Sequence, residues 1–95
     1  MRDNNNVIFV GEKPLMNYVT GVVMQFTTQS SDEVIIKARG KFISKAVDIS
    51  EVTMNRFLDN INIKNIKTGS EDFKNKEGRQ VRVSFVEITM KKKDL

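Results

Sequence analysis

The 95-residue sequence predicts an α/β fold, a two-layer sandwich of the α+β type whose elements follow the order β-α-β-α-β-β. Two kinds of hydrophobic periodicity support this order. Strand-like alternation or short apolar runs occupy residues 7–10, 34–39, 61–66 and 81–90. Helix-like spacing of three and four occupies residues 15–26 and 43–58. The length fits a single domain over residues 1–95, and we expect residues 1–6 and 92–95 to fray.

The first strand and the first helix are indicated by a short apolar run followed by a proline. Val7–Val10 is typical of a buried strand, which Gly11 closes. Pro14 suits the first turn of a helix, because the N–H that it lacks would be unpaired there. The amphipathic face of this helix consists of Leu15, Tyr18, Val19, Val22 and Phe26. The helix should end within the polar residues 27–31.

The second strand should carry its cations on one face. Val34, Ile36 and Ala38 alternate with Ile35, Lys37 and Arg39. A second helix should follow Gly40 and end near residues 59–60. Its apolar positions are Ile43, Ala46, Val47, Met54, Phe57 and Leu58.

The chain should end in a long β-hairpin. The third strand is opened by Ile61, Ile63 and Ile66, and the fourth by Val81, Val83 and Phe85. The alternation of inward-facing apolar residues shifts by one position at Phe85–Val86. This shift predicts a bulge or a change of partner strand there. The apolar alternation disappears between Thr68 and Gln80, so the tip cannot pack on a core. We expect a polar, mobile arm with about ten residues per strand and a length of roughly 30 Å.

The composition argues against an enzyme. The chain has no histidine and no cysteine, which removes the usual general base, the thiol nucleophile and the soft metal ligands. The glycines match neither a P-loop nor GxGxxG. We therefore expect no catalytic residue, no metal and no cofactor. Neither a signal peptide nor an apolar run of about 20 residues is present, so we expect a cytoplasmic location.

Basic residues are concentrated between Ile35 and Asp48, where the sequence reads IKARGKFISKAVD and contains no acid before its last residue. The four cations there, Lys37, Arg39, Lys41 and Lys45, should crowd around one strand-to-helix corner. Like charges repel at such short range, and a bound polyanion would relieve the repulsion. With a net charge of +4, the chain is predicted to bind nucleic acid.

Four segments of the chain resemble the Alba family of small archaeal chromatin proteins: GEKPLMNYV, VIIKARGKFISKAVD, NRFL and GRQVRVSFVEI. The resemblance extends from about Val7 to Lys92. It implies a βαβαββ fold and a homodimer that binds double-stranded DNA through the phosphate backbone and the minor groove, and that also binds RNA. It further implies a chromosome-associated protein that organises and condenses DNA.

The resemblance also implies roles for individual residues. The contacts of the body fall on Lys13, Arg39 and Lys41, with Lys37, Gly40 and Lys45 beside them, and those of the arm on Lys74, Lys76, Arg79 and Arg82. Contacts between neighbouring dimers fall on Asn55, Arg56 and Phe57. Glu12 stands where the family's chromatin members carry the lysine that is acetylated. We therefore expect no such switch here, and weaker binding than in those members.

Two alternatives remain open at this level. One is an RNA-binding protein or a subunit of a ribonucleoprotein, although the sheet is expected to lack the exposed aromatic pair with which an RRM stacks bases. The other is an assembly or adaptor protein whose basic surface docks on an acidic protein partner.

Overall fold

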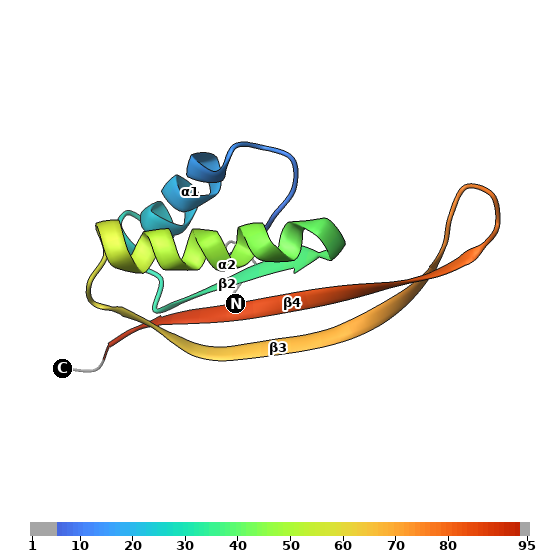
Figure 1. Cartoon of the computed structure of the whole chain (residues 1–95). Coiled ribbons are helices and arrows are strands. Elements are labelled where there is room, and N and C mark those ends of the chain that lie inside the picture. The colour runs from blue at the N-terminus through green and yellow to red at the C-terminus, as the bar shows by residue number, and fades with distance from the viewer. Residues whose placement is uncertain (1–5, 94–95) are drawn as a thin grey trace.

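The expected order of elements is confirmed. The computed structural model describes residues 6–93 and contains β1 (Val7–Phe9), α1 (Leu15–Thr27), β2 (Glu33–Arg39), α2 (Ile43–Val52), β3 (Ile61–Lys74) and β4 (Gln80–Lys92). Both helices lie on one face of the sheet, and no described element covers the other face (Figure 1). Neither of these helices is long and apolar enough to cross a membrane.

The expected fraying is wrong at the inner ends of the two terminal segments. The carbonyl of Asn6 accepts a backbone hydrogen bond from β2 at 2.9 Å. Lys92 is the last residue of β4, and the N–H groups of Lys92 and Lys93 donate to backbone carbonyls at 3.2 and 2.8 Å. Residues 1–5 and 94–95 lie outside the described part of the chain.

The sheet has the strand order β1-β2-β4-β3, in which β1 is parallel to β2 and the other pairs are antiparallel. Pairing of β2 with β4 stops at Arg39↔Phe85, whereas pairing of β3 with β4 continues to Lys74↔Gln80. The outer part of the β3–β4 hairpin therefore has no third strand beside it and projects from the body as an arm (Figure 1). The molecule is accordingly elongated, with principal extents of 50, 30 and 19 Å.

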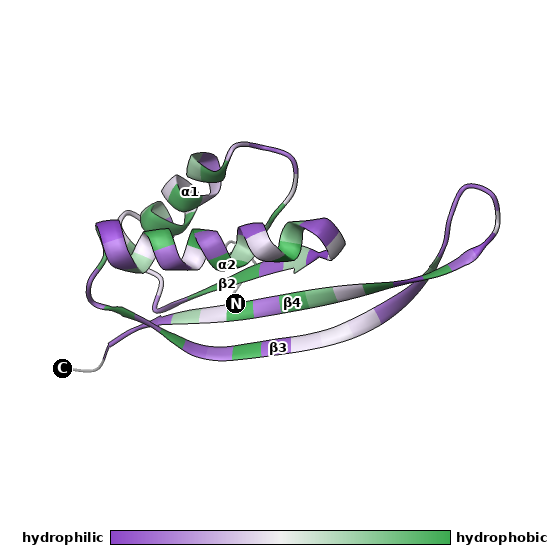
Figure 2. Ribbon diagram, viewed as in Figure 1, coloured by the Kyte–Doolittle hydropathy of each residue, from purple (hydrophilic) through white to green (hydrophobic). Residues whose placement is uncertain are grey.

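The core lies between the helices and the face of the sheet that they cover. The strands contribute Val34, Ile36, Ala38, Val86, Ile88 and Met90, and the helices contribute Val19, Val22, Phe26, Ala46 and Ile49. In Figure 2 hydrophobic stretches run through the body and along β4 into the arm, whereas the tip of the arm is mostly hydrophilic. The projecting arm is confirmed, but only residues 70–74 and 80–84 pair beyond the end of β2, about half of the expected length, and its mobility stays a prediction.

The phase slip in β4 has a different cause from a bulge. The register of β4 is regular at Phe85–Val86 against both neighbours, and the irregularity lies in β3 between Ile63 and Asn65. Val86 faces the core, so alternation places Phe85 on the uncovered face. Phe85 is also the last residue of β4 that pairs with β2. The slip therefore marks the point where β4 leaves the body and enters the arm.

The second helical segment is less regular than the sequence predicts. A 3-10 turn over Gly40–Phe42 precedes α2, and a π-helical turn over Thr53–Phe57 follows it. Two apolar residues that the spacing assigned to the inward face are exposed, Val47 to 43% and Phe57 to 51%. Val47 follows buried Ala46 directly and so points about 100° away from it. Phe57 lies in the wider turn, where an extra residue changes the helical phase.

Replacing Ile88 by alanine should lower the free energy of unfolding by about 2–5 kcal/mol, because the residue is 1% exposed and its deletion leaves a cavity. Val81→Ala, on the arm, should lower the free energy of unfolding by less than about 1 kcal/mol. Urea denaturation of the two variants measures this difference. Equal losses would contradict the division into a packed body and an independent arm.

Candidate nucleic-acid interface

The predicted basic corner lies where β2 turns into α2. Gly40 follows the last residue of β2 and has a φ of 51°, a left-handed conformation that glycine adopts without strain. This bend brings Arg39, on the uncovered face of the sheet, next to Lys41 in the 3-10 turn. Lys13 is presented nearby by the loop between β1 and α1. The sequence therefore located the corner correctly.

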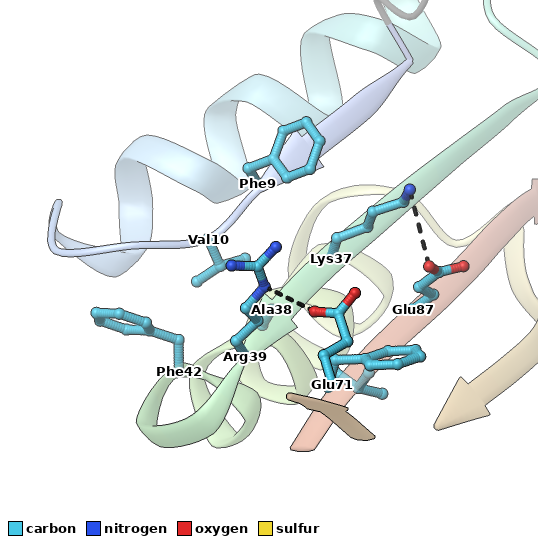
Figure 3. A pocket seen from close by; sticks show the side chains of 10 residues that line it. Phe9, Val10, Lys37, Ala38, Arg39, Phe42, Glu71 and Glu87 are labelled. Carbon is cyan, nitrogen blue, oxygen red and sulfur yellow. Dashed lines mark ion pairs between the residues drawn. The ribbon is translucent and has the colours of Figure 1, made fainter. Parts of the chain in front are cut away.

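The corner is not free of acids, and this part of the sequence argument is wrong. Lys37 lies 3.7 Å from Glu87, and Arg39 lies 3.3 Å from Glu71 (Figure 3). Lys41 lies 3.3 Å from Glu12. The carboxylates come from other elements: Glu87 from β4, Glu71 from β3 and Glu12 from the β1–α1 loop. A stretch of sequence without acids therefore acquires them through strand pairing, and charge repulsion alone does not require a polyanion here.

The ion pairs of Arg39 and Lys41 are exposed and consequently weak, whereas the side chains of Lys37 and Glu87 are only 37% and 31% exposed. The side chains of Lys41 and Glu12 are 75% and 80% exposed, and those of Arg39 and Glu71 are 61% and 45% exposed. Exposed pairs of this kind contribute about 0–1 kcal/mol. The carboxylates therefore hold Arg39 and Lys41 only weakly.

Lys45 does not present its charge to solvent as expected. Its ammonium donates to the carbonyl oxygens of Gly11 and Lys13 at 2.8 and 2.7 Å. It also lies 5.6 Å from the ring centroid of Tyr18 and 5.7 Å from that of Phe42. The side chain thus links α2 to the β1–α1 loop.

The arm carries basic residues that are less neutralised than those of the corner. Lys74, Lys76 and Arg79 are exposed, and no carboxylate within residues 6–93 lies at ion-pair distance from them. Arg82 differs, because its Nε donates to Oδ1 of Asp72 at 3.0 Å. The tip turns through Asn75, whose Oδ1 accepts the N–H groups of Glu77 and Arg79.

The corner and the arm form one continuous surface. The guanidinium of Arg39 stacks over the ring of Phe73 in β3 at 4.9 Å, in addition to its pair with Glu71. Glu71 lies near the start of the arm, and Phe73 lies one residue before the end of β3.

The uncovered face of the sheet carries one strongly exposed aromatic residue, Phe9, whereas Phe42 and Phe85 beside it are half-buried. A pocket of about 500 Å³ is lined by Phe9, Phe42 and Phe85 together with Lys37 and Arg39 (Figure 3). Phe9 is 71% exposed, and the ammonium of Lys37 lies 5.8 Å from its ring centroid. Burial in a monomer does not explain an aromatic residue so open to water.

The residues expected to join neighbouring dimers lie away from the corner. Asn55, Arg56 and Phe57 occupy the π-helical turn after the end of α2, whereas the corner lies before its start. All three are exposed, and Nδ2 of Asn55 donates to Glu51 at 3.4 Å. The structure therefore keeps this group separate from the basic surface.

Sequence reasoning missed Glu71, Glu87 and Tyr18 as members of the site. Tyr18 packs against the core as expected, and in addition its hydroxyl accepts the backbone N–H groups of Gly11 and Lys13 at 2.9 and 3.2 Å. The two glutamates become neighbours of the corner only through the register of β2, β4 and β3. No metal-binding cluster of three or more acidic, histidine or cysteine side chains is found in the described part of the chain.

Comparison with known proteins gives consistent results. A family model described as Alba matches residues 6–70. The chain is 42% identical over 86 residues to the DNA/RNA-binding protein Alba of Methanococcus maripaludis, covering 90% of this chain and 97% of that protein. Among solved structures, Alba from Thermoplasma volcanium superposes with a TM-score of 0.85 at 45% identity, over 92% of this chain and all of the other. An Alba protein of Trypanosoma brucei has the same fold at 23% identity, with a TM-score of 0.74 over 99% of this chain and 74% of its own.

Proposed function

The chain belongs to the Alba family, and from this membership we propose that it is a homodimeric protein that binds double-stranded DNA and organises the chromosome. Alba proteins are architectural nucleic-acid-binding proteins and not enzymes. The observation that carries the proposal is the family match over residues 6–70, which includes the whole corner. The location that follows from this role is the cytoplasm, in association with the chromosome.

The body of the protein would contact the phosphate backbone. Arg39, Lys41 and Lys13 would provide the main contacts, with Lys37 beside them and Gly40 allowing a close approach of the backbone. In this model phosphate oxygens take the places of Glu71 and Glu12, whose pairs with Arg39 and Lys41 are exposed. Contacts of this type position a protein on DNA without reading its sequence.

The arm would extend the contact along the duplex. Lys74, Lys76, Arg79 and Arg82 lie on an arm that projects beyond the body, and basic side chains of this kind bind the minor groove according to its width. Arg82 would first have to exchange Asp72 for phosphate. The arm would therefore add affinity and orientation but little sequence specificity.

A second copy of the chain would cover the pocket on the uncovered face of the sheet. Phe9 is 71% exposed and lines this pocket together with the half-buried rings of Phe42 and Phe85, and apolar surface open to solvent is typical of an interface. Lys37 and Arg39 line the same pocket, so they would have to reach phosphate from the edge of the dimer. Neighbouring dimers would then meet through Asn55, Arg56 and Phe57 at the opposite end of α2.

RNA is the second candidate ligand. The Methanococcus maripaludis relative bears the name DNA/RNA-binding protein, and phosphate contacts do not by themselves distinguish the two polymers. An adaptor role on an acidic protein has no observation in its favour beyond the positive charge.

The double variant Arg39→Ala, Lys41→Ala should bind a given duplex more weakly and with a smaller salt dependence. Four cations are lost per dimer, so the slope of log K against log salt should fall by up to about four. The matched control, Lys64→Ala with Lys93→Ala, removes the same charge near the end of the sheet opposite the arm and should change the slope much less. Fluorescence anisotropy at several salt concentrations measures the affinity and the slope for both variants. An unchanged slope in the corner variant would show that the corner does not contact DNA.

Replacing Glu12 by lysine should increase affinity for duplex DNA at fixed salt. The change removes a carboxylate that competes for Lys41 and adds a cation to each protomer, so the slope should steepen by about two per dimer. Glu51→Lys makes the same charge change on an exposed part of α2 and is the control. If the two variants gain equally, Glu12 has no specific effect on the corner.

Replacing Phe9 by serine should convert the dimer into monomers. Sedimentation equilibrium should give twice the chain mass of 10.9 kDa for the wild type and the single mass for this variant. Phe57→Ser, which removes a similarly exposed ring at the far end of α2, should remain dimeric. A dimer that survives Phe9→Ser would place the dimer contact on another surface.

A further inference from the structure

We propose that Lys45 is a positioning residue, which fixes the β1–α1 loop at Gly11–Lys13 and so sets the place of Lys13 and Glu12 at the corner, without contacting phosphate itself. Its importance for binding rests on the proposed function. The clamp itself is a property of the unbound chain and can be tested there.

The ammonium of Lys45 is already engaged. It donates to the carbonyl oxygens of Gly11 and Lys13 at 2.8 and 2.7 Å, and the rings of Tyr18 and Phe42 lie beside it. A lysine ammonium has three donors, and two of them are used here by the loop. A phosphate could reach only the one remaining donor unless this cation left two short hydrogen bonds.

The same loop residues are held from the other side by α1. The Tyr18 hydroxyl accepts the N–H groups of Gly11 and Lys13 at 2.9 and 3.2 Å. The N–H and the C=O of both residues are therefore bonded to side chains, the N–H groups to α1 and the carbonyls to α2. Between them, Glu12 is left to pair with Lys41. A loop without regular structure thus has a defined backbone on either side of Glu12.

The position of Lys45 in α2 also indicates a special role. It lies in the first turn of the helix, which contains no acidic residue. A cation there opposes the positive end of the helix dipole and is unfavourable unless another interaction compensates. The two loop carbonyls supply that interaction, because they turn the ammonium away from the helix and toward the β1–α1 loop.

Hydrogen exchange in the unbound protein tests the clamp. In Lys45→Met, the amides of Gly11 and Lys13 should exchange at least about tenfold faster than in the wild type, because the loop opens more often. Lys41→Met is the matched control, since it removes a cation of the same corner that interacts with the side chains of Glu12 and Phe42 and not with the loop carbonyls that Lys45 bonds, and it should leave both amides unchanged. Unchanged exchange in Lys45→Met would overturn the proposal.

A second measurement needs no variant and so does not depend on the folding of Lys45→Met. The wild-type protein is treated with an amine-acetylating reagent, with and without a saturating DNA duplex, and each lysine is quantified by mass spectrometry. Lys45 should react slowly in both samples, whereas Lys41 should react fast when unbound and become protected by the duplex.

Fast reaction of Lys45 in the unbound protein, suppressed by DNA, would show a direct phosphate contact and overturn the proposal. Failure of the duplex to bind would count against the proposed function, and slow acetylation of unbound Lys45 would still support the clamp.

Discussion

The exposed ion pairs at the corner determine how this protein can use its basic residues. Arg39 and Lys41 are held by Glu71 and Glu12, each at 3.3 Å, so in the binding proposed above a phosphate would replace each carboxylate. Exposed pairs contribute little to stability, and the exchange would therefore cost little. The displaced carboxylates would stay near the duplex, where their negative charge opposes that of the phosphates. We consequently expect a smaller salt dependence than the number of basic residues suggests.

Strand lengths explain how the corner and the arm come to share one surface. β2 ends at Arg39, opposite Phe85, while β3 and β4 continue to the tip. Arg39 thereby meets the arm, pairing with Glu71 near its start and stacking over Phe73 near the end of β3. The same contacts that neutralise Arg39 hold the arm against the body. A phosphate that displaced Glu71 would leave the stacking on Phe73 in place.

The sequence was sufficient for the order of elements and for the place of the corner, because both depend on local periodicity and on Gly40. It was insufficient for the charge balance, because Glu71 and Glu87 reach the cations only through strand register, which periodicity does not specify. Lys45 illustrates the same limit, since its partners are backbone carbonyls of a loop that no residue pattern reveals. The phase slip at Phe85 was visible in the sequence, but its cause, the end of β2, was not.

Carboxyl carbon-13 NMR of Glu12 and Glu71 during titration with a DNA duplex tests the exchange most directly. The signal of Glu71 should move toward its position in unbound Arg39→Ala, and that of Glu12 toward its position in unbound Lys41→Ala, as the protein becomes saturated. Both shifts would show that the carboxylates are released when phosphate arrives. If the duplex saturates the protein while both signals stay where they are, the corner keeps its internal pairs and the DNA is bound elsewhere.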